Sequence, residues 1–169
     1  MTLKKTIEYV FRELTLPWWC YVITLVLGLF VGIWKKKWTA GLLAAYLFFL
    51  LSGTVLTRTV GSLRYQFRPF WSYKYWRLHG TQIIANVLSY FPVGFLAGRM
   101  WKWRAVFFAV GVSICIELLQ LVTHTGLCEL DDVMHNSVGG LVGVAAAVLL
   151  QWRSSVRAKE KMLMNKNDF

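Results

Sequence analysis

The chain has 169 residues, of which 57% are hydrophobic, 16% aromatic and only 16% charged, whereas about a quarter of the residues of a soluble domain are charged. With a mean hydropathy of +0.49, this composition excludes a soluble globular domain, a disordered chain, a collagen-like repeat and a disulfide scaffold, and predicts a membrane protein. The net charge is +11, but the basic residues flank apolar runs, as topology signals do, so no nucleic-acid partner is expected.

The N-terminal segment, residues 1–16, is amphipathic. Ile7, Val10, Phe11 and Leu14 recur at helical spacing between charged residues. This spacing predicts a short helix that lies in the membrane interface, or one that packs against the rest of the protein.

Five apolar segments are long enough to cross about 30 Å of hydrocarbon as helices. They are residues 17–34, 39–57, 80–98, 105–123 and 133–151. The predicted fold is therefore all-α, with five transmembrane helices and a short N-terminal amphipathic helix. Three parts are expected: an interfacial segment at 1–16, a transmembrane domain at 17–151 and a basic tail at 152–169.

The distribution of Lys and Arg predicts the orientation in the membrane. The connections after spans one and three, together with the C-terminal tail, carry eleven basic residues, and the segments on the other side carry eight. The more basic side is expected to face the cytoplasm. The tail is therefore predicted to be cytoplasmic and the connections at 58–79 and 124–132 extracytoplasmic.

The fourth span carries an acidic residue, Glu117, which costs about 2.5 to 3.5 kcal/mol at the centre of a membrane helix. Ser113, Gln120 and His124 follow the same helical face as Glu117. Such a stripe is expected to point inward, toward a polar cavity. The alternative for Glu117 is a structural role beside an arginine.

Two neighbouring spans carry matching polar faces. Gln82, Asn86 and Ser89 line one face of the third span, with Tyr90 within reach, and Asp132 and Asn136 open the fifth. Behind them Gly139, Gly140 and Gly143 form a small-residue face that permits close helix packing, either within the chain or between chains. The three polar faces are predicted to meet in one pocket. Helix capping by one of the aspartates and isolated interhelical hydrogen bonds are the structural alternatives.

The second connection supplies positive charge. Arg58, Arg64 and Arg68 precede a rigid aromatic segment, Pro69 to Tyr73. Arginine offers a planar fork of donors suited to phosphate, so this loop is a candidate for holding a phosphorylated lipid head group. The arginines could instead neutralise the acids or contact ordinary lipid phosphates.

No cofactor is predicted. A divalent metal is a possibility that no motif supports, because the potential ligands match no zinc spacing. Those ligands are His124, Glu129, Asp131, Asp132 and His135.

The ordered set of these residues resembles the VanZ-like family of small bacterial membrane proteins, over about residues 45 to 150. The matching positions are Arg58, Arg64, Pro69 to Tyr73, Asn86, Phe91 to Gly94, Ser113, Glu117, Gln120, Gly126, Glu129, Asp131, Asp132, His135, Asn136, Gly139 and Gly143. Leu127 stands where many members have arginine. The resemblance implies a polytopic bacterial envelope protein, in a family named after a member associated with teicoplanin resistance and proposed to process lipid head groups or lipid-linked wall precursors.

These observations favour an enzyme that cleaves or transfers a phosphate-linked lipid head group at the outer leaflet. The candidate catalytic residues are Glu117 as general acid or base, Asp132 and Asp131 for positioning or proton abstraction, and Gln120, Asn136 and Asn86 for orientation. The candidate phosphate- or substrate-binding residues are Arg58, Arg64, Trp71, Ser72, Tyr73 and Ser113, with His124, His135 and Glu129 as secondary candidates. The alternatives are a non-catalytic protein that binds a lipid or precursor, and a small proton-coupled lipid transporter.

Overall fold

The computed structural model describes Val22, Ile23, Val26, Leu27, Phe30, residues 38–56, Arg58, residues 60–61 and residues 64–167, with side chains as far as residue 165. The described chain is mostly helical. Its elements are α3 (Trp38–Leu51), the π-helical turn η1 (Ser52–Leu56), β1 (Tyr65–Gln66), α4 (Trp71–Lys74), α5 (Trp76–Trp101), the 3-10 turn η2 (Lys102–Arg104), α6 (Ala105–Thr123), β2 (Cys128–Glu129) and α7 (Leu130–Asn167).

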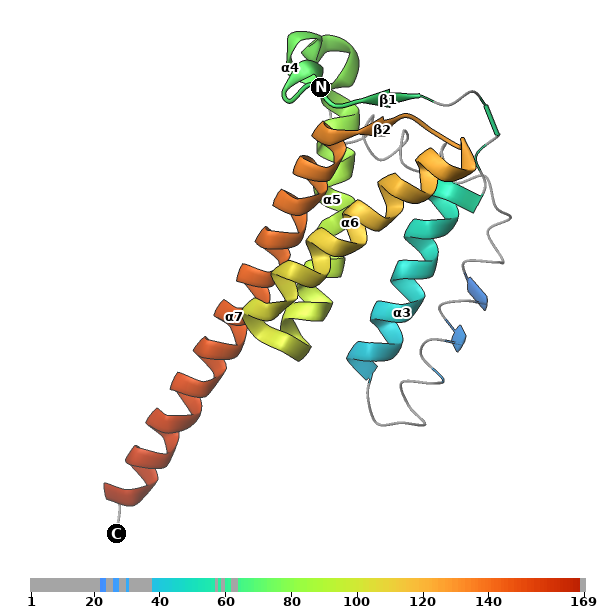
Figure 1. Ribbon diagram of the computed structural model, residues 1–169. Coiled ribbons are helices and arrows are strands. Elements are labelled where there is room, and N and C mark those ends of the chain that lie inside the picture. Colours follow the sequence, from blue (N-terminus) through green and yellow to red (C-terminus); the bar gives the residue numbers. More distant parts are fainter. Residues whose placement is uncertain are drawn as a thin grey trace.

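Three continuous helical stretches are long and apolar enough to cross a membrane: Trp38–Leu56, Trp76–Thr123 and Leu130–Asn165. The second stretch contains both α5 and α6, and the chain reverses its direction between them at η2 (Figure 1). Lys102 has a φ of 54° at this reversal, a value that ends the regular α5 backbone.

Four of the predicted spans coincide with these helices. Residues 39–57 correspond to α3 with η1, and the next three correspond to α5, α6 and the first part of α7. The predicted span at 17–34, apart from five scattered positions, and the amphipathic helix at 1–16 lie outside the described residues.

The outward faces of the helices are apolar. Phe107 and Val122 on α6 are 82% and 76% exposed, and Leu149 on α7 is 55% exposed. Side chains of this kind in such numbers require a lipid environment instead of water. The chain is therefore a membrane protein whose helices pack around a thin core.

The core lies where α5, α6 and α7 meet. Val93, Ala97, Ala105 and Val144 are fully buried there. Glycines lie at the contact between α5 and α7, where the two backbones touch: a Cβ added to Gly143 would lie 2.1 Å from the Phe91 carbonyl oxygen. The predicted small-residue face of α7 therefore packs within the chain, against α5.

The two long connections lie at one end of the bundle. β1 pairs in parallel with β2, with Tyr65 opposite Cys128 and Gln66 opposite Glu129, and α4 lies at the same end (Figure 1). We call this end, with Arg58, residues 60–61, 64–75 and 124–129, the polar end. The turn η2 and the C-terminal part of α7 lie toward the opposite end (Figure 1).

Candidate functional site

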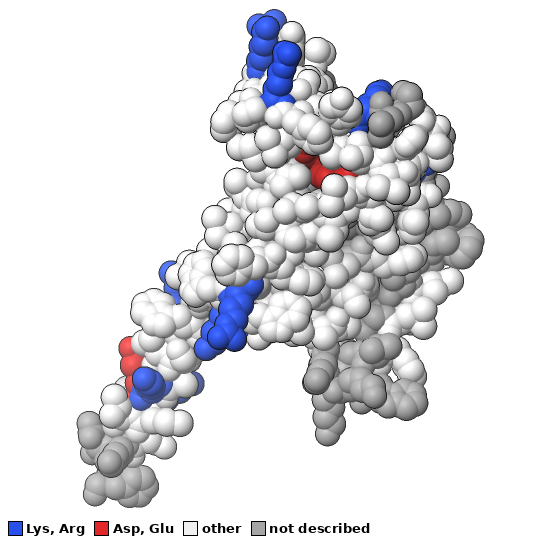
Figure 2. Space-filling view, viewed as in Figure 1, with Lys and Arg blue, Asp and Glu red and all other residues white. Residues whose placement is uncertain are grey.

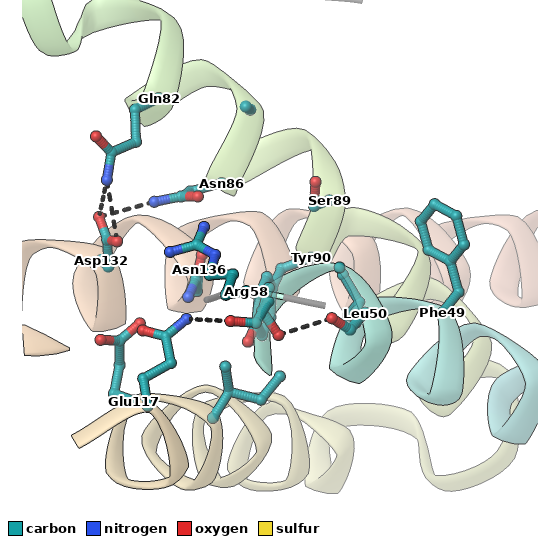
Figure 3. A pocket seen from close by; sticks show the side chains of 15 residues that line it. Phe49, Leu50, Arg58, Gln82, Asn86, Ser89, Tyr90, Glu117, Asp132 and Asn136 are labelled. Atoms are coloured by element: carbon teal, nitrogen blue, oxygen red, sulfur yellow. Dashed lines mark hydrogen bonds between the residues drawn. The ribbon is translucent and has the colours of Figure 1, made fainter. Parts of the chain in front are cut away.

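A cavity of about 110 Å³ opens between the helices close to the polar end. Its walls come from α3 and η1, from α5, from α6 and from the first turns of α7 (Figure 3). The polar lining consists of Thr54, Arg58, Gln82, Asn86, Ser89, Tyr90, Glu117, Gln120, Asp132 and Asn136. Acidic atoms are visible within an otherwise uncharged stretch of surface near this end of the molecule (Figure 2). This volume holds several water molecules or one small polar group.

Asp132 is held by two amides of α5. Asn86 Nδ2 donates to Asp132 Oδ1 at 2.8 Å, and Gln82 Nε2 donates to Asp132 Oδ2 at 3.2 Å. Gln82 and Asn86 are four residues apart, so both side chains leave the same face of α5 and converge on one carboxylate of α7 (Figure 3). The two bonds fix Asp132 as an oriented acceptor at the cavity wall.

Glu117 reaches the cavity from the last two turns of α6. Its Oε2 accepts the backbone N–H of Glu129 at 3.0 Å, which connects α6 to β2. The side chain is only 4% exposed, yet it lines the cavity together with Asp132. Two carboxylates from different helices therefore face one shared space.

Asn136 and Tyr90 each bring an unsatisfied polar atom to the cavity. Asn136 Nδ2 donates to Ser113 Oγ at 3.0 Å. Asn136 Oδ1 and the Tyr90 hydroxyl are buried and have no hydrogen-bond partner among the residues that the structure describes. A buried polar atom without a partner is rare in a folded protein and calls for an explanation, such as a water or a ligand.

The positive charge of the cavity comes from Arg58, an exposed residue at its edge. A Cβ added to Gly126 would lie 3.2 Å from Arg58 Nη1 and 3.3 Å from Gln120 Oε1. The guanidinium therefore lies beside Gln120, one turn of α6 from Glu117, and glycine at 126 gives it the room to do so.

Asp131 faces away from the cavity and anchors the aromatic segment. Its carboxylate accepts the backbone N–H of Phe70 at 2.6 Å, the N–H of Ser72 at 3.0 Å and the Ser72 hydroxyl at 2.5 Å. Phe70 is held with a φ of 61°, so the three bonds stabilise a strained turn that begins α4. All three hydrogen bonds of Asp131 are therefore made to the aromatic segment.

His135 extends the same face of α7, one turn after Asp131. Its Nε2 lies 3.0 Å from the Tyr73 hydroxyl, and its Nδ1 is buried without a partner. His124 lies elsewhere, at the exposed C-terminal cap of α6, where its carbonyl accepts the N–H of Gly61 at 2.7 Å. Neither histidine lines the cavity.

The predicted site residues thus divide into two groups. Those that line the cavity are Arg58, Asn86, Glu117, Gln120, Asp132 and Asn136. Those that do not are Arg64, Trp71, Ser72, Tyr73, Ser113, His124, Glu129, Asp131 and His135. Ser113 still supports the site indirectly through Asn136, whereas Arg64 is exposed and contributes its carbonyl to the backbone of Cys128.

Thr54 and its neighbours on η1 complete the wall but carry no sequence signal. Gln120 Nε2 donates to the Thr54 carbonyl at 3.0 Å, and the Thr54 hydroxyl donates to the Leu50 carbonyl at 2.7 Å. The second span contains no charged, amide or histidine side chain, so no strongly polar stripe marks this face. The lining role of Gln82 and Tyr90, in contrast, follows from their place beside Asn86.

No three His, Cys, Asp or Glu side chains in the described part of the chain are placed to share a metal ion. The acids of residues 124–135 bind different protein partners instead: Glu129 accepts from Trp71 Nε1 at 3.2 Å, while Asp131 binds the aromatic turn.

Glu129 lies between the cavity and the aromatic segment. Burial raises its pKa from 4.5 to about 7, and the negative charge of Asp132 adds to the increase, while the hydrogen bond from Trp71 and the charge of Arg58 oppose it. The folded protein therefore holds a proton on Glu129 at a pH where the unfolded chain has released it.

This difference predicts a pH-dependent stability. Between pH 4.5 and about 7, the unfolded chain binds fewer protons than the folded one, so stability falls as the pH rises through this window. Thermal unfolding in detergent should occur at a higher temperature at pH 5 than at pH 7.5, and Glu129→Gln should reduce that difference. Glu160→Gln, at an exposed position on α7, is the matched control. If the difference in unfolding temperature between pH 5 and pH 7.5 is as large in Glu129→Gln as in the wild type, the Glu129 carboxyl does not cause it.

A protein-family model described as VanZ/LLP1 matches residues 18–151 of the chain. Neither a curated protein nor a solved structure matches it significantly. The matched range includes every residue that lines the cavity.

Proposed function

The chain belongs to the VanZ-like family, and from this premise we propose that its cavity binds the phosphate-linked head group of a membrane lipid and catalyses cleavage or transfer of that head group. The observation that carries the proposal is the convergence of Glu117, Asp132 and Arg58 on one cavity. Carboxylates are expensive in a membrane helix, so two of them around an open space point to a function.

The depth of the cavity suits a head group. Asp132 and Asn136 lie in the first two turns of α7, and Glu117 and Gln120 lie in the last two turns of α6. At 5.4 Å per turn these residues are within about 10 Å of the helix ends. Head groups occupy the layer just outside the hydrocarbon, so a lipid of the adjacent leaflet reaches the cavity with little displacement.

We assign the acid–base role to Glu117. Asp132 is fixed as an acceptor by two amides, whereas Glu117 accepts a single backbone N–H. Glu117 would take the proton of an attacking hydroxyl or water as the oxygen of that nucleophile bonds to phosphorus. The bond to the leaving oxygen then breaks, and that oxygen receives the proton from Glu117. Arg58 would bind phosphate oxygens and Asp132 would position the head group.

The proposed setting is the cytoplasmic membrane of a bacterium, with the tail of α7 in the cytoplasm and the polar end outside. If the lipid is a lipid-linked cell-wall precursor, the same activity would change susceptibility to glycopeptides such as teicoplanin. A second candidate, binding without chemistry, is favoured by the two amide donors that already hold Asp132 in place. Such a protein would shield the precursor instead of altering it.

Turnover by the full-length protein tests the proposal. The protein is purified in detergent and supplied with labelled glycerophospholipids and polyprenyl-phosphate-linked sugars, and released or transferred head groups are separated by chromatography. Its nine tryptophans report by fluorescence that it is folded. Release from at least one lipid, retained by Glu160→Gln, is the expected result. A folded preparation that binds lipid without turnover favours the second candidate, and one that neither binds nor converts any lipid contradicts both.

A further inference from the structure

The side-chain amide nitrogens of the cavity lining already take part in protein hydrogen bonds. Each of the four uses at least one of its two N–H groups on a protein oxygen: Gln82 and Asn86 donate to Asp132, Gln120 to the carbonyl of Thr54, and Asn136 to Ser113. The Thr54 hydroxyl donates to the Leu50 carbonyl. Arg58, at the edge, is the charged donor of the lining.

The lining also offers acceptors that the described residues leave open. Asn136 Oδ1 is buried and has no hydrogen-bond partner among those residues, on a side chain that is 4% exposed. Each carboxylate has about four lone-pair positions, of which Glu117 and Asp132 fill only some with the bonds described above. The Tyr90 hydroxyl, also unpartnered and on a residue 2% exposed, can accept or donate.

The charges of the lining do not balance. It carries two carboxylates, one buried and one half-buried, and one guanidinium, so the ionised side chains leave one negative charge in excess. A phosphate placed against Asp132 and Asn136 would add a negative charge beside a carboxylate in a region of low dielectric, which is strongly unfavourable. Arg58, beside Gln120 and one turn of α6 from Glu117, offers the phosphate a positive charge within reach of the acid–base group. A ligand with its phosphate at Arg58 must therefore place a different group against Asp132 and Asn136.

We propose that the cavity recognises an aminated head group, in which an N–H-bearing ammonium lies against Asp132 and Asn136 and the adjoining phosphate lies at Arg58. An ammonium supplies three donors and a positive charge, which match the unpaired Asn136 Oδ1 and the excess of carboxylates. A polyol would supply donors without the charge, and a quaternary ammonium would supply the charge without donors. The inference rests on the proposed function and specifies its substrate class.

A set of short-chain lipids with identical tails tests this recognition. Dihexanoyl phosphatidylethanolamine, phosphatidylglycerol, phosphatidylcholine and phosphatidic acid are titrated into the full-length protein in detergent, with tryptophan fluorescence as the readout. Phosphatidylethanolamine should bind at least about ten-fold more tightly than the other three. Asp132→Asn should abolish this preference, while Glu160→Gln should retain it.

Tyr90→Phe provides a second variant, since it removes a hydroxyl that has no hydrogen-bond partner among the described residues. It should weaken the binding of phosphatidylethanolamine several-fold. If Asp132→Asn does not fold, Tyr90→Phe decides, and an unchanged affinity for phosphatidylethanolamine overturns the inference.

The remaining outcomes separate the inference from the proposed function. Equal binding of all four lipids, or a preference for phosphatidylglycerol, overturns aminated recognition and leaves a head-group site in place. Binding of none of them overturns both. If Mg²⁺ alone saturates the cavity and prevents phosphatidylethanolamine from binding, the cavity is a metal-cation site. This result also overturns the inference.

Discussion

Gly94→Ala is expected to destabilise the bundle by more than about 2 kcal/mol, enough to remove most folded protein from a detergent extract. A Cβ at position 94 would lie 1.9 Å from the backbone oxygen of Gly140 and 2.7 Å from its carbonyl carbon. Both obstacles are backbone atoms of α7, so no side-chain rotation relieves the clash. α5 and α7 would have to separate, and the contacts on either side of the cavity would separate with them.

The measurement is the yield of monodisperse protein on size-exclusion chromatography, together with its thermal unfolding. Gly111→Ala is the matched control, because a Cβ there meets nothing within 4 Å and alanine has the higher helix propensity. It should be neutral or slightly stabilising. If Gly94→Ala unfolds at the same temperature as Gly111→Ala, the close approach of α5 and α7 is wrong.

Much of the helical architecture follows from the sequence because two physical rules act locally. Hydropathy places the spans, and the glycines at 139, 140 and 143 mark a face of close approach. The partner of that face does not follow from spacing. The partner is fixed by backbone atoms of α5: a Cβ added to Gly139 or Gly143 would lie 2.1 Å from the carbonyl oxygen of Val87 or Phe91, respectively. Contacts between distant segments leave no periodic pattern in the sequence.

The two adjacent aspartates show how much of the site helical periodicity predicts. Consecutive residues on a helix differ by about 100°, so Asp131 shares a face with His135 and Asp132 shares another with Asn136. The first pair contacts the aromatic segment and the second lines the cavity. Grouping both acids in one site, as the sequence prediction did, overlooks this separation.

The side chains of the short helix α4 are the hardest to place from the sequence. Trp71, Ser72 and Tyr73 are close to the acids, as expected from charge and aromatic content, but as partners of Glu129, Asp131 and His135 at the polar end. Their turn depends on the left-handed conformation of Phe70, which a bulky residue adopts only under tertiary constraint. No local pattern predicts such a conformation.

Glu117→Gln is expected to lower turnover at least about 100-fold while lipid affinity stays within about two-fold of the wild type. Glutamine retains the size of the side chain and an oxygen that can accept the Glu129 N–H, so the connection between α6 and β2 persists. It cannot take or release a proton at the reacting oxygens. The change therefore removes acid–base chemistry and leaves the bonds that hold Asp132 untouched.

Steady-state turnover and lipid titration on the same preparation separate the two effects, with unfolding temperature as the check on folding. Asp132→Asn should behave differently: because Asp132 positions the head group, its substitution should weaken binding as well as turnover. Glu160→Gln should match the wild type in both measurements, since Glu160 is exposed on α7, in the predicted tail beyond the cavity.

A Glu117→Gln protein that keeps turnover within ten-fold of the wild type would exclude this carboxyl as the acid–base group, because such a group contributes at least about 100-fold. The catalytic role would then have to be assigned to another residue, and the cavity would retain only its binding function.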